Sequence, residues 1–311
     1  MNPHRKNLDR RGWLQHSAAL SLTGWLAAPL LSLASEDAAD AESGLPYLDR
    51  IGLQLYTVRD QMAADPKATL KAVADAGYKQ VELMNVDESA VEIAAIAREN
   101  GMRVHSAFIN WKSIASPEKN DGLDIPTTIE IGERIGLRHL VFGYIDKQSR
   151  KTADLCKAIA DRANKAAEAT RNAGMRMAYH NHSFEFGRFD GGKLNAFDIF
   201  VERFDPQLMD FELDVFWAKI GGYDPIDLMK RLAGRITMMH LKDLKPETPV
   251  IFDEGQVPKD AFQECGDGSI DMPAVMRLAK EIGALECHVE QDQSPDPIKS
   301  IGQSYQFLSG V

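Results

Sequence analysis

The chain alternates short runs of hydrophobic and β-branched residues with longer amphipathic segments. Short apolar runs bounded by turn residues are typical of buried parallel strands, whereas apolar positions that recur every three or four residues predict helices. Eight runs are expected to be strands: 51–56, 80–83, 103–108, 139–143, 176–180, 211–214, 236–240 and 286–290. The clearest helical patterns between them cover 66–76, 88–100, 152–173 and 273–282.

Glycines stand where several of the predicted helices end before the next strand. A left-handed residue commonly terminates a helix, and glycine adopts that conformation without strain. These positions are Gly77, Gly101, Gly136, Gly174 and Gly283. Eight strand–helix units in this order predict an α/β fold, a single-domain (β/α)8 TIM barrel spanning residues 47–311.

The alternative fold is a doubly wound open sheet, which predicts a glycine-rich phosphate loop after an early strand. The sequence contains neither GxGxxG nor GxxxxGK[ST], so the barrel is favoured. The longest connection, residues 244–272, follows the seventh strand and is rich in proline, glycine and acidic residues. We expect it to form a lid.

The first 34 residues differ from the rest of the chain. A basic opening leads into a short apolar stretch, and residues 32–34 form a plausible cleavage site, which is the pattern of a secretory signal. The pair Arg10 and Arg11 resembles a twin-arginine signal, which predicts export to the periplasm. Residues 35–46 read as a flexible leader. The alternative is an uncleaved membrane anchor, but after cleavage no apolar run is long enough for a stable membrane span.

The remaining composition excludes several classes of protein. The chain has 36 Lys and Arg against 46 Asp and Glu, a net charge of −10, which argues against a nucleic-acid partner. Its three cysteines, Cys156, Cys265 and Cys287, are widely spaced and form neither a CxxC pair nor a disulfide framework.

The last four predicted strands each end in histidine or a carboxylate. The active site of a TIM barrel lies at the C-terminal ends of its strands, so these side chains are expected to converge. An aspartate at a strand end is more often a helix cap, and a lone histidine is more often a core residue, but four consecutive strands share the feature. Mixed imidazole and carboxylate ligands suit Mn, Co, Mg or Zn. The residues are His180, Asp214, His240 and Glu290.

Six stretches spread over the chain resemble the xylose-isomerase-like TIM-barrel superfamily of sugar isomerases and epimerases. They are IGLQLYTVRD (51–60), AYHNHSFEF (178–186), ELDVFW (212–217), HLKD (240–243), GDGSIDMPA (266–274) and VEQD (289–292). The resemblance implies a divalent metal ion, with Asp214, His240 and Glu290 at the last three ligand positions. The first position is usually glutamate in that family. Here it is His180, and Glu185 is an alternative fourth ligand or a substrate-facing base.

These residues suggest a mechanism. A metal ion polarises a carbonyl group, a carboxylate removes the proton from the next carbon, and an enediolate results. Glu290 and Glu185 are the candidate bases. Lys242 is expected to hold a developing oxyanion, or else to be a surface residue paired with Asp243. Candidates for contact with substrate are Gln54, His105, His182, Trp217 and Asp292, with Tyr56, Phe108 and Trp111 near the floor and rim.

The predicted export and the absence of a phosphate loop favour a free sugar or keto-sugar as substrate. Reprotonation of the enediolate gives an epimer or an aldose–ketose isomer, and loss of a β-leaving group gives elimination. A metal-dependent sugar isomerase or epimerase is the first hypothesis. A lyase acting on 3-keto-glycosides or an inosose-dehydratase-like lyase is the second. A non-catalytic exported sugar-binding barrel is a third, and the resemblance also implies a homo-oligomer.

Overall fold

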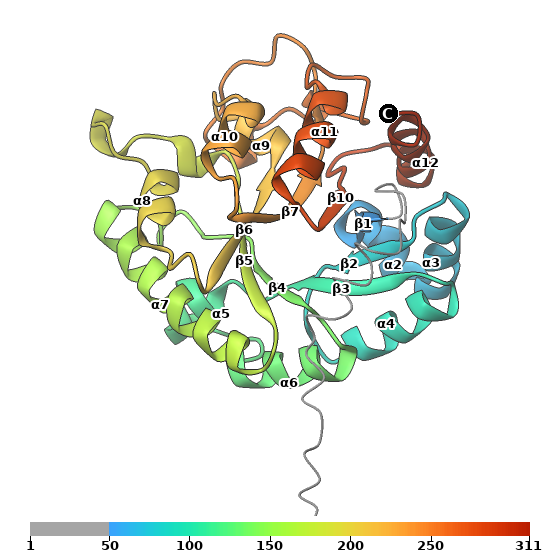
Figure 1. Ribbon diagram of the computed structural model, residues 1–311, viewed down its shortest axis with the longest axis horizontal. Helices are drawn as coiled ribbons and strands as arrows, with labels where there is room; N and C mark the ends of the chain where they lie inside the picture. The colour runs from blue at the N-terminus through green and yellow to red at the C-terminus, as the bar shows by residue number, and fades with distance from the viewer. Residues whose placement is uncertain (1–49) are drawn as a thin grey trace, which may run out of the picture. The chain divides into compact units, whose positions relative to one another are not determined.

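Eight parallel strands close into a barrel in the order β1-β10-β7-β6-β5-β4-β3-β2, and helices surround it (Figure 1). The computed structural model describes residues 50–311, except for the side chain of Asp190, so the predicted signal (1–34) and leader (35–46) lie outside the described residues. The barrel strands are β1 (Ile51–Gln54), β2 (Gln80–Leu83), β3 (Arg103–Phe108), β4 (His139–Phe142), β5 (Arg176–His180), β6 (Met209–Asp214), β7 (Ile236–Leu241) and β10 (Glu286–Val289).

The predicted single-domain TIM barrel is therefore confirmed. The helices are α2 (Arg59–Ala64), α3 (Pro66–Asp75), α4 (Ala90–Glu99), α5 (Lys112–Ala115), α6 (Ile125–Ile135), α7 (Ala153–Asn172), α8 (Ala196–Arg203), α9 (Val215–Ile220), α10 (Pro225–Arg231), α11 (Met272–Ile282) and α12 (Pro297–Leu308). All five glycines expected to follow helices have positive φ angles. Across residues 50–311, no helix combines the length and apolar character needed to cross a membrane.

Local sequence explains where several helices begin. At α3, α10 and α12 an aspartate side chain accepts a backbone N–H of the first turn, and proline occupies the next position. Aspartate satisfies donors that the helix cannot pair itself, and proline has no N–H to lose there. These pairs determine the residue at which each of the three helices begins.

The barrel has an apolar exterior and an unusually polar interior. Outside the strands, the ring of Tyr179 lies 4.9 Å from that of Phe200 and 5.4 Å from that of Phe204. Inside, polar and charged side chains are completely or almost completely buried, among them Gln54, Glu82, His180, Glu212, Asp214, His240 and His288. Branched aliphatic residues usually fill a TIM-barrel interior, so this polar column indicates a functional centre.

The 244–272 segment returns to the barrel through a small antiparallel sheet, in which β8 (Asp243–Leu244) pairs with β9 (Phe262–Gln263). One buried carboxylate, that of Asp243, fastens both ends of the segment. Its two oxygens accept backbone N–H groups at 2.8–3.1 Å from Leu244, Gly266, Gly268 and Ile270. A Cβ atom on Gly268 would lie 2.1 Å from Asp243 Oδ1, so this close approach requires glycine.

Candidate active site

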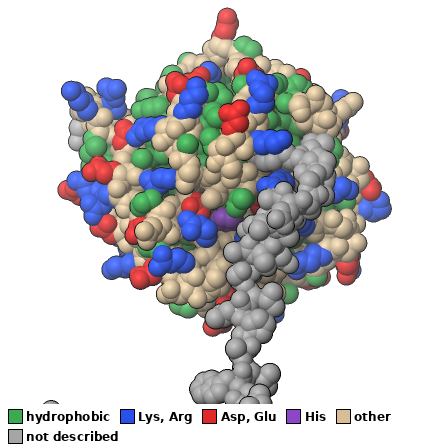
Figure 2. All heavy atoms as spheres, in the orientation of Figure 1, with side chains coloured by type: hydrophobic (Ala, Val, Ile, Leu, Met, Phe, Trp, Pro, Cys, Tyr) green, Lys and Arg blue, Asp and Glu red, His purple; other side chains and the backbone are tan. Residues whose placement is uncertain are grey.

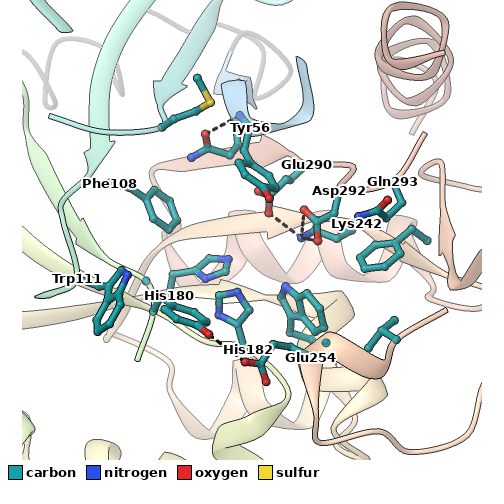
Figure 3. A pocket seen from close by; sticks show the side chains of 18 of the residues that line it. Tyr56, Phe108, Trp111, His180, His182, Lys242, Glu254, Glu290, Asp292 and Gln293 are labelled. Carbon is teal, nitrogen blue, oxygen red and sulfur yellow. Dashed lines mark hydrogen bonds and ion pairs between the residues drawn. The ribbon is translucent and has the colours of Figure 1, made fainter. Parts of the chain in front are cut away.

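A cavity of about 660 Å³ opens at the C-terminal ends of the barrel strands (Figure 3). Ten residues singled out from the sequence as ligand, catalytic or substrate-contact candidates line it: Gln54, Tyr56, Phe108, Trp111, His180, His182, Trp217, Lys242, Glu290 and Asp292. Lys242, Glu290 and Asp292 gather on one side in Figure 3, and Phe108 and Trp111 lie on the other. The cavity therefore has a charged wall and an aromatic wall.

The four predicted metal ligands converge beneath the cavity. We call His180, Asp214, His240 and Glu290 the pocket group; each offers one ligand atom, and these atoms all lie within 4.8 Å of one another. His240 Nδ1 lies 3.0 Å from Glu290 Oε2 and 3.1 Å from His180 Nε2. His180 Nε2 lies 3.4 Å from Asp214 Oδ2. These separations are close to the ~3.3 Å between donors in a tetrahedral site with bonds of ~2.0–2.1 Å.

Backbone hydrogen bonds orient the Asp214 carboxylate toward the other members of the pocket group. Its Oδ1 accepts the Trp217 N–H at 2.8 Å and caps α9, while its Oδ2 is buried without a hydrogen-bond partner among the described residues. The Asn181 side chain donates a hydrogen bond to the Asp214 carbonyl and accepts one from the Asp214 backbone N–H. Asp214 is thus both a helix cap and a candidate ligand. Oδ2 faces His180 Nε2 and the Lys242 ammonium, each at 3.4 Å. A buried carboxylate oxygen without a close hydrogen bond fits a divalent cation, so the donor set suits the implied metal ion.

The fourth position of the pocket group belongs to His180. Glu185, the alternative, is completely buried, and its carboxylate accepts the Tyr179 hydroxyl at 2.6 Å and the His182 backbone N–H at 2.9–3.0 Å. It does not line the cavity. Burial raises the pKa of Glu185 to about 8. The prediction that Glu185 is a ligand or a substrate-facing base is therefore not supported, because β5 ends at His180 and the chain turns this side chain beneath the pocket.

Lys242 is fully buried rather than a surface residue. Its ammonium group donates to Glu290 Oε2 at 2.6 Å and to the Asp292 carboxylate at 3.1–3.2 Å, and it lies 3.4 Å from Asp214 Oδ2. Burial alone would lower the pKa of Lys242, but the surrounding carboxylates raise it above its ordinary value. Its partner is not Asp243, which is occupied by backbone N–H groups.

The two carboxylates beside Lys242 have opposite properties. Burial would raise the pKa of Glu290, but the positive charges of Lys242 and His240 hold it well below its usual range. Burial raises the pKa of Asp292 to about 6, with Lys242 acting in the opposite direction. Glu290 is thus a poor proton acceptor, and Asp292 is ionised near neutral pH while still able to take up a proton.

The rest of the cavity wall is aromatic. His182 stacks on Phe184 with ring centroids 5.5 Å apart and lies 5.1 Å from the Trp217 ring. Burial lowers the pKa of His182 well below its usual value, so its imidazole is neutral. Flat, apolar walls with a few polar groups suit a polyhydroxylated ring.

The 244–272 segment forms part of the cavity wall, as expected of a lid. Glu254, Gly255, Val257, Lys259 and Phe262 line the cavity. Arg150 donates to both Glu254 oxygens at 2.8 Å, and the Tyr144 hydroxyl donates to Glu254 at 3.2 Å. Sequence reasoning found the segment but not these residues, because their partners are distant in sequence.

One residue predicted to contact substrate, His105, lies outside the cavity. His105 does not reach the cavity, because β3 continues for three residues beyond it to Phe108. Its Nδ1 lies 2.6 Å from the carboxylate of Glu286, the first residue of β10. His105 is therefore near the N-terminal end of the barrel, the end opposite the pocket.

Sequence reasoning missed a layer of charged residues inside the barrel. Glu212 precedes Asp214 by two positions on β6, and His288 precedes Glu290 by two on β10. Alternate residues of a strand face the same side, so this spacing was a usable signal. His288 was expected to be an interior structural residue, and it is buried. Glu82 on β2 completes the layer.

Known proteins resemble the chain in sequence and in fold. The inosose dehydratase of Geobacillus kaustophilus is 29% identical over 152 residues, 46% of this chain and 48% of that protein. That of Clostridium botulinum strain Alaska E43 is 28% identical over 161 residues, 48% of this chain and 52% of that protein. The chain thus spans about half the length of the curated relatives it matches.

Solved structures show the same fold over most of the chain. A sugar phosphate isomerase/epimerase from Parabacteroides distasonis superposes with a TM-score of 0.70 at 24% identity, covering 88% of this chain and 98% of that one. An IOLI protein with a bound zinc atom superposes with a TM-score of 0.61 at 15% identity, covering 84% and 97%. At such identities the likeness extends to the fold alone. The sequence profile that matches residues 70–310, together with the closed barrel, shows that the chain belongs to the xylose isomerase-like TIM-barrel family.

Proposed function

We propose that this protein is a divalent-metal-dependent enzyme that removes a proton next to the carbonyl group of a polyhydroxylated keto substrate. The observation that carries the proposal is the convergence of the pocket group beneath the cavity, next to Lys242 and Asp292, which line its wall. When bound there, the metal ion would polarise the carbonyl oxygen as a Lewis acid. The predicted export of the protein stays a prediction, and it favours a free rather than a phosphorylated substrate.

Asp292 is the proposed base. It lines the cavity, its pKa of about 6 keeps it ionised at neutral pH, and Lys242 holds it at 3.1–3.2 Å. Glu290, the base expected from the sequence, is held between His240 and Lys242 and accepts a proton less readily. The Lys242 ammonium also stabilises negative charge that develops on a nearby substrate oxygen.

Elimination fits this arrangement best. A proton passes from carbon to Asp292, and Asp292 then returns it to the hydroxyl that leaves from the adjacent carbon, so that the C–O bond breaks and water is released. One carboxylate on one wall is enough for this sequence. The curated relatives named inosose dehydratase support the same class of reaction on a keto-cyclitol or keto-sugar.

Isomerisation or epimerisation is the second candidate. Epimerisation needs a proton donor on the far side of the substrate, and the aromatic wall offers His182, which lines the cavity. The neutral imidazole of His182 is a weaker candidate for that role than a second carboxylate. A protein of the same fold is named L-ribulose 3-epimerase (TM-score 0.61, 18% identity), and this name supports epimerisation as the second candidate.

Two further functions agree less well with the charges of the molecule. A nucleic-acid enzyme needs a continuous basic surface, whereas acidic and basic side chains are interspersed on the face in Figure 2. A non-catalytic sugar-binding barrel does not require four buried ligand-type side chains. Replacing Asp214 with Asn separates the cases, because a binder keeps its affinity for sugar and the enzyme loses turnover.

The test is proton exchange. Metal-loaded protein is incubated in D2O with an inosose, free keto-sugars and 3-keto-glycosides, and NMR follows the C–H group beside each carbonyl. Elimination predicts loss of that signal together with a dehydrated product or a released aglycone. Asp292→Asn should abolish exchange, and chelated protein serves as the control. Exchange without elimination favours the isomerase, and the absence of exchange in every substrate contradicts the proposal.

A further inference from the structure

A second cluster of potential metal ligands lies inside the barrel, one layer below the pocket group. We call Glu82, Glu212, His240 and His288 the inner group; they come from β2, β6, β7 and β10. Each is at most 1% exposed, and their ligand atoms all lie within 4.8 Å of one another. His240 is common to both groups.

The distances in the inner group suit a small cation. His240 Nε2 lies 2.8 Å from Glu82 Oε1 and 3.3 Å from Glu212 Oε1, and His288 Nδ1 lies 3.4 Å from Glu212 Oε1. Donors around a tetrahedral ion with bonds of ~2.0–2.1 Å are separated by about 3.3 Å. Two of the three contacts already have this spacing, and the third needs to open by about half an ångström. Two imidazoles and two carboxylates are donors that suit Zn²⁺, Co²⁺ or Mn²⁺.

Hydrogen bonds within the described residues do not satisfy these carboxylates. Glu82 Oε1 accepts Gln54 Nε2 at 2.8 Å and faces His240. Glu212 Oε1 faces His240 and His288 as an ion pair at 3.3–3.4 Å, whereas Glu82 Oε2 and Glu212 Oε2 are buried without a partner among the described residues. Burying an ionised carboxylate without a partner costs several kcal/mol (order of magnitude). The unpartnered atoms point to a missing positive ligand.

His240 faces both groups. Its Nδ1 lies 3.0 Å from Glu290 Oε2 of the pocket group, and its Nε2 lies 2.8 Å from Glu82 Oε1 of the inner group. One ring nitrogen is therefore available to each group.

Coordination of His288 through Nδ1 requires the neighbouring Gln80 amide to turn over. The other His288 nitrogen, Nε2, lies 3.3 Å from Gln80 Nε2, and Gln80 Oε1 is buried without a partner. Turning the amide over gives His288 Nε2–H an acceptor, the arrangement usual for metal-bound histidine, at the cost of the bond from Gln80 to the Arg50 carbonyl.

We propose that Glu82, Glu212, His240 and His288 form a second site for a divalent transition-metal ion, bridged to the pocket group by His240. With both groups filled, His240 binds one ion through each ring nitrogen, and its remaining ring proton is released to solvent. None of Glu82, Glu212 and His288 lines the cavity, so the inner ion is enclosed by protein. It would neutralise the buried carboxylates and fix the orientation of His240.

Metal stoichiometry tests the proposal without any substrate. The full chain is stripped with a chelator, reloaded with Zn²⁺ or Co²⁺, desalted and analysed by elemental mass spectrometry. We expect two ions per chain for the wild type, one for Glu212→Gln and one for Asp214→Asn. Glu185→Gln, an equally buried glutamate outside both groups, should retain two and is the matched control.

One ion in the wild type and none in Asp214→Asn would overturn the proposal and identify the inner group as a hydrogen-bonded network. If Glu212→Gln does not fold, the wild type still decides, because anomalous scattering from Co²⁺-loaded crystals shows either two peaks in the barrel or one. The result is independent of the proposed function: a protein that binds two ions but exchanges no substrate proton contradicts the function alone.

Discussion

Replacing Lys242 with Met should strengthen metal binding while it abolishes turnover. The ammonium group touches Glu290 Oε2 at 2.6 Å and lies 3.4 Å from Asp214 Oδ2, so it competes with a cation for two members of the pocket group. Adding a ligand bond of ~2.1 Å to the 2.6 Å contact places ion and ammonium within about 5 Å. Even with the screening of bulk water, repulsion between charges of +2 and +1 at that separation is ~1.7 kcal/mol. Its removal corresponds to roughly 15-fold tighter binding.

Calorimetric titration of the metal-free proteins with Mn²⁺ measures this change. Without metal, the same variant should be less stable by about 3–5 kcal/mol, because three buried carboxylates lose their cation, and metal ions should restore more stability to it than to the wild type. Lys259→Met, which removes an exposed lysine from the same cavity, is the matched control and should alter neither quantity. Weaker metal binding by Lys242→Met, or unchanged proton exchange with substrate, would refute the reasoning.

Three further substitutions test other parts of the structure. Because burial raises the pKa of Glu185 to about 8, the folded protein holds a proton that the unfolded chain has lost above pH ~4.5, so this group makes stability fall between about pH 4.5 and 8. Glu185→Gln should remove a few kcal/mol of that loss of stability, since each pH unit between the folded and unfolded pKa values corresponds to ~1.4 kcal/mol. Urea unfolding at pH 5 and pH 8 measures the change, and an equal loss of unfolding free energy in the variant and the wild type would contradict this. Arg150→Met removes the partner of Glu254 and should accelerate amide hydrogen exchange in residues 253–257 by about 10–100-fold, because a charged hydrogen bond contributes ~1.5–3 kcal/mol. Unchanged exchange measured by mass spectrometry would show that the Arg150–Glu254 pair does not hold this segment in place. His105→Leu should cost about 1–3 kcal/mol, because it removes the side chain that pairs with Glu286 at 2.6 Å. Substrate turnover should be preserved, so a large loss of activity in a stably folded variant would indicate that His105 takes part in the active site.

The barrel was predictable from sequence because its signals are local. The strand cores, the helix-ending glycines and the aspartate–proline helix starts each depend on a few neighbouring residues. The convergence of Asp214, His240 and Glu290 was also predictable, since parallel strands of a barrel end at a common mouth. The point at which each strand stops was not predictable in the same way. His105 was misplaced because β3 runs on to Phe108, and Glu185 because β5 stops at His180.

The residues missed in the site depend on long-range geometry. Glu254 meets Arg150 across more than a hundred positions of sequence, and no periodic pattern connects them. Glu82 was overlooked because a charged residue within an apolar strand is ordinarily assigned to a solvated face. In this barrel it faces inward and meets His240 from the other side of the ring of strands. The inward direction of a charged residue such as Glu82 can be recognised once the strands are arranged in the closed barrel.

The four backbone N–H groups that hydrogen-bond to Asp243 bear on how the 244–272 segment can vary in sequence and length. A single carboxylate, adjacent in sequence to Lys242, ties the departure and the return of the 244–272 segment to the same point of the barrel. Whatever lies between those anchors can lengthen, shorten or change composition while the ionisable residues beneath keep their positions. The segment can therefore be exchanged as a unit, and grafting the corresponding stretch of a relative between Leu244 and Gly266 offers a route to new substrate preferences while the proposed base, Asp292, stays in place.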